Sequence, residues 1–430
     1  MKPVDHGAPG DAGLAPVQPG QRLASLDLLR GFALLGIFLV NIPLFSFPVE
    51  LGLTPGDTLE STADRISVLL VAILAEGKFI SLFSLLFGAG VTIQWMRARA
   101  RNTPFAGMYV RRLLVLLCFG LIHAIGFWYG DILVLYACLG FVLLPLLKLS
   151  PRNLLITAGV LLTVCIVLMS LLAFFQALGK QFPLIAPTME EGGELLTGLQ
   201  AIETYPWASE QLLAAESNAY AEGPLADALA FRVMTWGFFI VMVFFSYAWH
   251  VMTMFLVGTA MIKVGFFDPS RILLQKKAAI MGLSIGLPLE ILDGFLFAMR
   301  GFTHGWTSIA SAFLSEIGTV SIAIGFAGLG SWLVSSGGLT RVVGWICSVG
   351  RMALTNYLLQ TLVATTIMYW WGFGMFGSVE RSSLVLLVLG FYVLQVIFSV
   401  AWLQVFQMGP FEWLWRTITY LRPPALLRRN

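Results

Sequence analysis

The chain has 430 residues, of which 58% are hydrophobic and only 11% charged, and its formal net charge is +3. Soluble domains carry about 25% charged residues, so the composition excludes an assembly of ordinary soluble domains. The small net charge gives no basis for a nucleic-acid partner. Apolar runs of about 20 residues are long enough to cross a hydrocarbon core about 30 Å thick. The sequence therefore predicts an all-α polytopic membrane protein embedded in a lipid bilayer.

The chain is expected to form one transmembrane helical domain over residues 22–421. The Pro/Gly/Ala-rich residues 1–21 are predicted to be a disordered cytoplasmic tail, and residues 422–430 are predicted to be a basic cytoplasmic tail. The first apolar run is too long for a signal peptide and is read as a retained span. About ten transmembrane helices are expected, near residues 28–47, 67–96, 112–129, 131–148, 153–175, 232–263, 274–298, 306–334, 342–371 and 383–407.

Charges in the connecting segments alternate along the chain. Basic segments follow the second, fourth and sixth runs and end the chain, while acidic or neutral segments lie between them. By the positive-inside rule this alternation places both termini in the cytoplasm. Two short helices within 232–263 would put the basic 263–277 segment outside, so this alternative is rejected. Pro145 and Pro288 are the expected kink sites inside spans.

The connection over about 176–231 is long and acidic, and it is predicted to lie outside. Loops of this length usually contain structure of their own. Residues 208–221 are rich in Ala, Glu, Gln and Leu, so we expect short helices here. A cap over a cavity and a solvated spacer are both consistent with this composition.

His123 is the first functional candidate, because ionisable residues at membrane depth are costly and usually face the bundle interior. Arg112 precedes it by 11 residues, which places both side chains on one helix face about 16 Å apart along the axis. Asp131 begins the next span at its outer end. An imidazole near mid-membrane can accept and donate a proton, or can simply hydrogen-bond a neighbouring helix.

Further polar residues lie inside the later spans. His250 is flanked by apolar residues, and a structural role is favoured for it. Glu290 and Asp293 share one helix face, and Glu316 lies in the next span. These three carboxylates are consistent with a proton relay, with the orientation of a catalytic imidazole, or with a lock between helices and a cation.

Arginines suggest an anionic ligand. Arg351 lies about 15 Å along a helix from Arg341, a depth that points to a phosphate or a buried carboxylate as its partner. Asn356 follows on the same span. Arg30 and Arg112 lie among other cytoplasmic arginines, which suits a phosphate-bearing ligand, although the positive-inside bias also explains such residues. The four cysteines and four histidines show no metal-binding spacing, so no metal is expected.

Five segments together resemble the YeiB-like bacterial membrane proteins, a domain-of-unknown-function family. These segments are RLASLDLLRGFALLGIFLVNI, EGKFISLFSLLFGAG, RRLLVLLCFGLIHAIGFWYGDIL, GRMALTNYLLQT and GPFEWLWRTITY. The opening L-D-x-L-R-G block also resembles that of heparan-α-glucosaminide N-acetyltransferases and other multispan acyltransferases. Those enzymes carry an acetyl group from cytoplasmic acetyl-CoA to a sugar across the membrane, using an embedded histidine. The resemblance matches Asp27 and Arg30 to the opening block and His123 to that histidine.

The leading functional expectation is a transmembrane acyltransferase of the bacterial inner membrane. Acetyl-CoA or another acyl-CoA would be the donor, with no metal, and the acceptor would be a sugar, lipid or small metabolite. His123 would act as base or acyl carrier, and Asp131 would orient it or meet the acceptor near the outer surface. The predicted binding residues are Asp27, Arg30, Arg112, Arg351, Asn356 and Glu290. The alternatives are a transporter of a small anionic solute and a non-catalytic scaffold, and the oligomeric state is open, a homodimer included.

Overall fold

The computed structural model of the protein describes residues 23–181, 195–207 and 209–428. The predicted N-terminal tail, 1–21, lies outside the described residues. In the described ranges the repeating structure is helical, and an isolated bridge joins Phe406 to Leu427. The helices are α1 (Ala24–Ser46), α2 (Val49–Leu53), α3 (Thr62–Leu74), α4 (Lys78–Ala100), α5 (Ala106–Gly126), α6 (Leu133–Leu146), α7 (Pro151–Gln181), α8 (Gly198–Thr204), α9 (Glu210–Ala221), α10 (Leu225–Met242), α11 (Ala248–Lys263), α12 (Ile272–Met299), α13 (Ser308–Ser335), α14 (Thr340–Arg351), α15 (Ala353–Met368), α16 (Arg381–Val405) and α17 (Pro410–Tyr420).

The prediction of an all-helical multispan protein is confirmed. Across the described ranges, eight helical segments are long and apolar enough to cross a membrane, and the bent pair α14–α15 makes a ninth. The predicted span over 131–148 is the shorter apolar helix α6, of 14 residues. Every run expected from the sequence therefore corresponds to a helix or a helix pair. The cytoplasmic position of the termini stays a prediction.

Two of the candidate spans, Thr62–Ala100 and Leu225–Lys263, each consist of two helices with an irregular junction. Helices α3 and α4 meet at Ala75–Gly77, where Gly77 has a φ of 75° that glycine adopts readily. Helices α10 and α11 are joined by a π-helical turn, Val243–Tyr247. Pro145 and Pro288 lie inside α6 and α12, whereas the 77° bend between α14 and α15 lies at Met352, where no proline is present.

Glycines let the central helices approach one another closely. A Cβ on Gly88 of α4 would lie 2.1 Å from the carbonyl oxygen of Phe255, and one on Gly258 of α11 would lie 1.9 Å from that of Leu85. A Cβ on Gly350 of α14 would lie 1.8 Å from the carbonyl oxygen of Asp27. Because glycine has no side chain, the backbones of neighbouring helices come into direct contact at these positions, as is usual between membrane helices.

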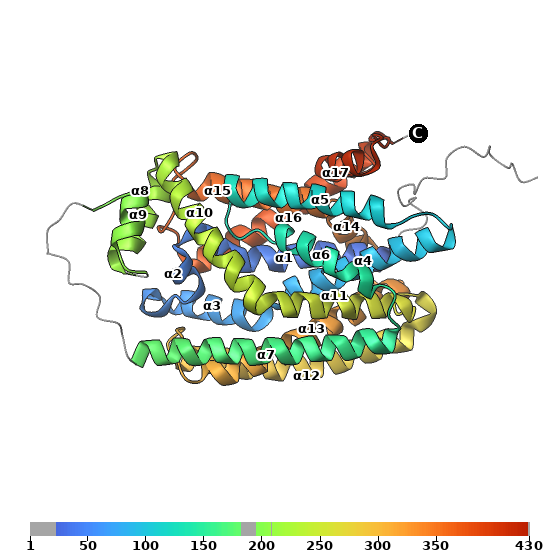
Figure 1. The fold of residues 1–430 in the computed structure, drawn as a ribbon, viewed down its shortest axis with the longest axis horizontal. Helices are drawn as coiled ribbons and strands as arrows, with labels where there is room; N and C mark the ends of the chain where they lie inside the picture. Colours follow the sequence, from blue (N-terminus) through green and yellow to red (C-terminus); the bar gives the residue numbers. More distant parts are fainter. Residues whose placement is uncertain (1–22, 182–194, 208, 429–430) are drawn as a thin grey trace, which may run out of the picture.

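The long helices run along the longest axis of the molecule, and the two ends differ (Figure 1). At one end, which we call the cap end, α8 and α9 lie across the helix termini, and α2 is nearby. Buried residues of this connection, among them Tyr205 and Tyr220, form a second apolar cluster with the end of α1 and the end of α15. The predicted short helices within 176–231 are therefore present. At the opposite end, the mouth end, α17 packs against α5 and the start of α15.

Candidate functional site

A cavity of about 460 Å³ runs inside the bundle along α1 and α4. Its lining extends from Leu23, directly before α1, to Asn41 on α1, and from Phe79 to Arg97 on α4. At 1.5 Å per residue each of these stretches is about 27 Å long. The cavity therefore reaches from the mouth end through much of the membrane thickness.

Arginines gather at the mouth end of this cavity. The six that line it come from α1, from α4 and the residue after it, and from α5, α14 and α17; they are Arg30, Arg97, Arg101, Arg112, Arg351 and Arg416. Two carboxylates, Asp27 and Glu412, lie among them. Guanidinium groups bind phosphate with parallel hydrogen bonds, so this end of the cavity suits a ligand with several negative charges.

Several of these arginines are held by contacts of their own. Arg30 pairs with Asp27 at 3.2 Å, and the guanidinium of Arg112 lies 3.8 Å from the ring centroid of Trp415. The Trp415 indole in turn donates to the Arg112 carbonyl oxygen at 3.1 Å. Arg351 donates to the Gln407 carbonyl oxygen at 3.3 Å. Helix α17 thus closes one side of the mouth.

Glu412 joins α17 to the start of α15. Its carboxylate accepts hydrogen bonds from the amides of Leu354 and Thr355, at 2.6 and 3.0 Å, and from the Thr355 hydroxyl at 2.5 Å. The first amides of a helix have no partner within the helix, and the helix dipole favours a negative charge there. Burial raises the pKa of Glu412, and the bonds from Thr355 and Leu354 oppose that rise. A residue distant in sequence therefore caps α15 where the cavity passes it.

Beyond the arginines the cavity wall is apolar and aromatic. Phe79, Phe83 and Phe87 line it from α4, and Leu133 and Tyr136 from α6. Polar ligand atoms find few partners along this stretch. The lining suits the uncharged part of an amphiphilic ligand whose anionic group stays at the mouth.

His123 lies directly behind the deep wall of the cavity. Its Nδ1 is 2.8 Å from Asp131 Oδ2 and its Nε2 is 2.9 Å from the Thr361 hydroxyl. The imidazole is 2% exposed and does not line the cavity, but Tyr357, whose ring centroid is 5.2 Å from that of His123, does. Gly130 and Ile132, on either side of Asp131, line it too. We call Asp131, His123 and Thr361 the cavity triad.

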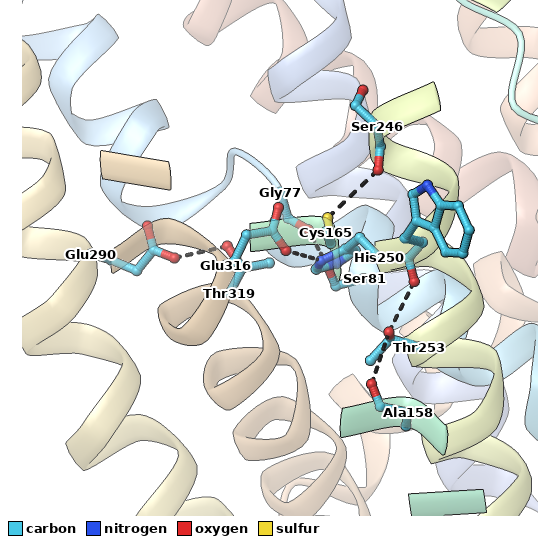
Figure 2. Close-up of polar contacts among 11 residues, drawn as sticks. Gly77, Ser81, Ala158, Cys165, Ser246, His250, Thr253, Glu290, Glu316 and Thr319 are labelled. Carbon is cyan, nitrogen blue, oxygen red and sulfur yellow. Dashed lines mark hydrogen bonds and ion pairs between the residues drawn. The ribbon is translucent and has the colours of Figure 1, made fainter. Parts of the chain in front are cut away.

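A second group with the same order of contacts lies between α4, α11 and α13 (Figure 2). His250 Nδ1 is 2.5 Å from Glu316 Oε2, and its Nε2 is 2.6 Å from the Ser81 hydroxyl. All three side chains are buried, and Tyr247 stacks on the imidazole with ring centroids 5.0 Å apart. We call Ser81, His250 and Glu316 the core triad.

An ion pair lies next to the core triad. Lys78 Nζ is 2.5 Å from Glu290 Oε2, and Thr319 donates to the other oxygen of Glu290 at 2.8 Å. Thr319 is one helical turn from Glu316 on α13, and Figure 2 shows both side chains on the same side of the helix. The pair locks α4 to α12. Among the described residues, no three His, Cys, Asp or Glu side chains gather as metal ligands would.

Known sequences resemble the chain over almost its whole length. The uncharacterized protein YxaH of Bacillus subtilis is 34% identical over 423 residues, which is 95% of this chain and 96% of that protein. The uncharacterized protein YeiB of Escherichia coli is 30% identical over 409 residues, 93% of this chain and 96% of that protein. The profile described as "Protein of unknown function (DUF418)" matches residues 261–422. The chain belongs to the DUF418 family. No solved structure matches it.

In this DUF418 protein, four of the six predicted binding residues line one cavity: Asp27, Arg30, Arg112 and Arg351. The other two lie elsewhere. Asn356 is fully buried and donates to the Val349 carbonyl oxygen and the Ser399 hydroxyl. Glu290 is paired with Lys78 in the core. The predicted catalytic residues His123 and Asp131 contact each other behind the cavity wall.

Sequence reasoning missed several residues of this site. Glu412 and Trp415 lie in the last quoted family segment, but only the fold brings them to the cavity mouth. Thr361 and Tyr357 lie on the predicted span with Arg351, and the helical spacing gave no reason to pair them with His123. For Arg97 and Arg101 the sequence offers a signal, a cluster of basic residues after the second span, but the positive-inside rule explains that cluster without a binding site.

Proposed function

We propose that this protein is a transmembrane acyltransferase of the bacterial inner membrane that uses acetyl-CoA or another acyl-CoA as its donor. The observation that supports this proposal best is the course of the cavity, from six arginines at the mouth to a wall backed by the His123–Asp131 pair. A phosphate-rich donor with an uncharged arm and a reactive end matches this sequence of environments. The acceptor would be a sugar, a lipid or a small metabolite.

The donor is expected to enter from the mouth end. Its phosphates would contact Arg30, Arg112 and Arg351, and the uncharged arm would follow the apolar wall between α1 and α4. Along α5, the 11 residues from Arg112 to His123 correspond to about 16 Å. The thioester would then lie at the wall formed by Gly130, Ile132 and Tyr357.

The imidazole of His123 would act as general base. An ionised Asp131 only accepts hydrogen bonds, so His123 carries its proton on Nδ1 and presents the Nε2 lone pair to Thr361. Because neither His123 nor Thr361 lines the cavity, the wall at Tyr357 has to open for the acceptor to reach Nε2. An acceptor hydroxyl or amine that then replaces the Thr361 hydroxyl gives up its proton to Nε2 and attacks the thioester carbon. The carbon–sulfur bond then breaks, and the imidazolium returns the proton to the leaving thiolate.

Acetyl-CoA binding tests the proposal on the purified full chain in detergent, measured by calorimetry. We expect micromolar binding that is weakened at least tenfold in Arg30→Ala and Arg112→Ala, because each loses a charge-assisted contact. Arg152→Ala is the matched control, since Arg152 is exposed at the start of α7 and does not line the cavity. Absence of binding by acetyl-CoA and by longer acyl-CoAs would contradict the proposal.

Transport of an anionic solute is the second candidate, and the bend between α14 and α15 favours it. Discontinuous helices whose N-termini point at anionic groups are typical of transporter binding sites. The first amides of α15 lie at the cavity, although Glu412 occupies them. Proton-dependent uptake of an anion into liposomes, without consumption of acyl-CoA, would favour this candidate over the enzyme.

A further inference from the structure

The hydrogen bonds of the core triad can be arranged in two ways, which differ in where the Ser81 hydroxyl donates its hydrogen. The Ser81 hydroxyl lies 2.6 Å from His250 Nε2 and 2.5 Å from the carbonyl oxygen of Gly77, but it has only one hydrogen to donate. It therefore donates either to the imidazole or to the carbonyl group. On the other side of the ring, an ionised Glu316 can only accept, so it takes the hydrogen of Nδ1 in both arrangements.

Each arrangement corresponds to one protonation state of His250. When Ser81 donates to Nε2, the imidazole is neutral. When Ser81 turns toward Gly77, Nε2 carries a hydrogen that the hydroxyl oxygen accepts, and the ring is an imidazolium paired with Glu316. The Gly77 carbonyl keeps its bond from the Ser81 amide, at 3.0 Å, in either state. No buried polar group loses its partner when the proton arrives or leaves, so both states avoid that cost.

We infer that Ser81, His250 and Glu316 form a proton-binding site inside the membrane, which loads and unloads as the Ser81 hydroxyl rotates. This inference does not depend on the proposed transferase activity. A second acceptor for a buried hydroxyl is ordinary, but here it frees Nε2 to take up a proton without leaving a polar group unpartnered.

The helices around the core triad are irregular in two places that a structural lock does not require. The π-helical turn Val243–Tyr247 ends three residues before His250, and the break at Ala75–Gly77 lies just before Ser81. Single π-helical turns occur often at functional sites, and broken helices supply ion sites in many transporters. Both irregularities therefore favour a functional role for the triad.

Polar side chains lead from the core triad toward the cap end. Thr319 follows Glu316 on α13 and donates to Glu290, which is paired with Lys78. Asp293 lies nearly one turn beyond Glu290 and shares Ser311 with Arg300, the residue that follows α12. A proton that moves between the cap end and the buried site would meet polar side chains along this line.

The titratable groups that face the core triad come from every packed element. They are Glu316 on α13, Lys78 on α4, Glu290 on α12, Cys165 on α7, Tyr136 on α6 and Tyr247 in the π-helical turn. Lys78 and Glu290 compensate each other at 2.5 Å. Glu316 is consequently the carboxylate that balances a charge on His250.

Nitrogen NMR of the full chain, labelled with ¹⁵N-histidine and reconstituted in lipid bilayers, tests the inference. The signals of His250, identified by their loss in His250→Gln, should change from neutral to imidazolium shifts within pH 5 to 9. Ser81→Ala should lower the midpoint by about one pH unit, because a hydrogen bond to a charged group is worth more than one to a neutral group. Ser84→Ala is the control, since Ser84 bonds Tyr136 instead, and it should leave the midpoint unchanged.

Two results would overturn the inference. His250 signals that stay in one protonation state across this pH range in the unmodified protein would show a structural contact only. A midpoint in Ser81→Ala equal to that of the unmodified protein would show that the hydroxyl plays no part in proton binding. If Ser81→Ala does not fold, the titration of the unmodified protein alone decides.

Discussion

The cavity triad and the core triad share one chemistry but differ in their surroundings. In both, a hydroxyl contacts Nε2 of a buried histidine and a carboxylate contacts Nδ1, at distances between 2.5 and 2.9 Å. The cavity triad lies behind the part of the cavity wall that Tyr357 and Gly130 form, and a ligand in the cavity can contact these two residues. The core triad is packed among helices and linked to an ion pair. Access, more than the residue types, separates a candidate catalytic group from a candidate proton site.

The hydroxyl groups differ as well. Ser81 has a second acceptor at 2.5 Å, the Gly77 carbonyl oxygen, whereas the corresponding acceptor of Thr361, the Tyr357 carbonyl oxygen, is 3.5 Å away. At 3.5 Å a hydrogen bond is weak. Thr361 therefore directs its hydrogen to His123, which keeps Nε2 unprotonated and able to act as a base.

The largest expected effect is a difference in acyl-transfer activity between variants of the two histidines. His123→Ala should lower acyl transfer about 10³-fold, the usual range for losing a general base, while acetyl-CoA binding persists. His250→Ala should keep transfer within a few-fold of the unmodified protein. Thiol release from acetyl-CoA, with bacterial membranes supplying the acceptor, measures both. Equal losses in the two variants would erase the distinction between the triads.

Stability should respond most at the ion pair beside the core triad. Lys78→Met leaves the Glu290 carboxylate buried without its cation, which should cost about 3–5 kcal/mol of unfolding free energy. The double variant Lys78→Met/Glu290→Leu removes both charges and should recover most of that loss. Denaturant unfolding in detergent gives the comparison. A single variant as stable as the unmodified protein would mean that the pair is not formed.

A smaller effect is expected where α17 meets the cavity. Glu412→Gln keeps the side-chain shape but removes the charge that caps α15, which should cost about 0.5–2 kcal/mol. Hydrogen exchange should quicken at the amides of Leu354 and Thr355 and stay unchanged on α11. Unaltered exchange at both amides would show that the carboxylate does not cap the helix.

The mildest test concerns the cap end, distant from the arginines. Burial raises the pKa of Glu216 to about 8 from its ordinary 4.5. The folded protein therefore binds this proton more tightly than the unfolded chain, so its contribution to stability is full below pH 4.5 and is lost as pH rises through about 8. The thermal midpoint should fall as the pH rises from about 4.5 to about 8 and level off above that, and Glu216→Gln should flatten this fall. An equal slope in both proteins would contradict the assignment.

Much of the fold could be predicted because the bilayer imposes a simple length rule on apolar runs. Within the 176–231 connection, α9 followed from helix propensity over 208–221, whereas α8 lies outside that segment. The bend at Met352 could not be predicted, since no proline marks it and the predicted span runs without a break from 342 to 371. The Glu412 contact that caps the second half of this span depends on packing between distant segments.

The candidate site was predictable only where one helix carries the pattern. His123 and Arg112 share α5, and Asp131 follows closely in sequence, so spacing was informative. The sequence grouped Glu290 with the ligand-binding residues, and it could not show that α4 brings Lys78 to Glu290 or Ser81 to His250. These contacts join residues up to 212 positions apart.

The central claim is that the cavity places a thioester against the wall in front of His123. An electron cryo-microscopy map of the full chain with a non-hydrolysable acetyl-CoA analogue tests it most directly. The account predicts phosphate density among Arg30, Arg112 and Arg351 and the acetyl end beside Gly130 and Tyr357. An analogue bound elsewhere, with the cavity unfilled at saturating concentration, would contradict it.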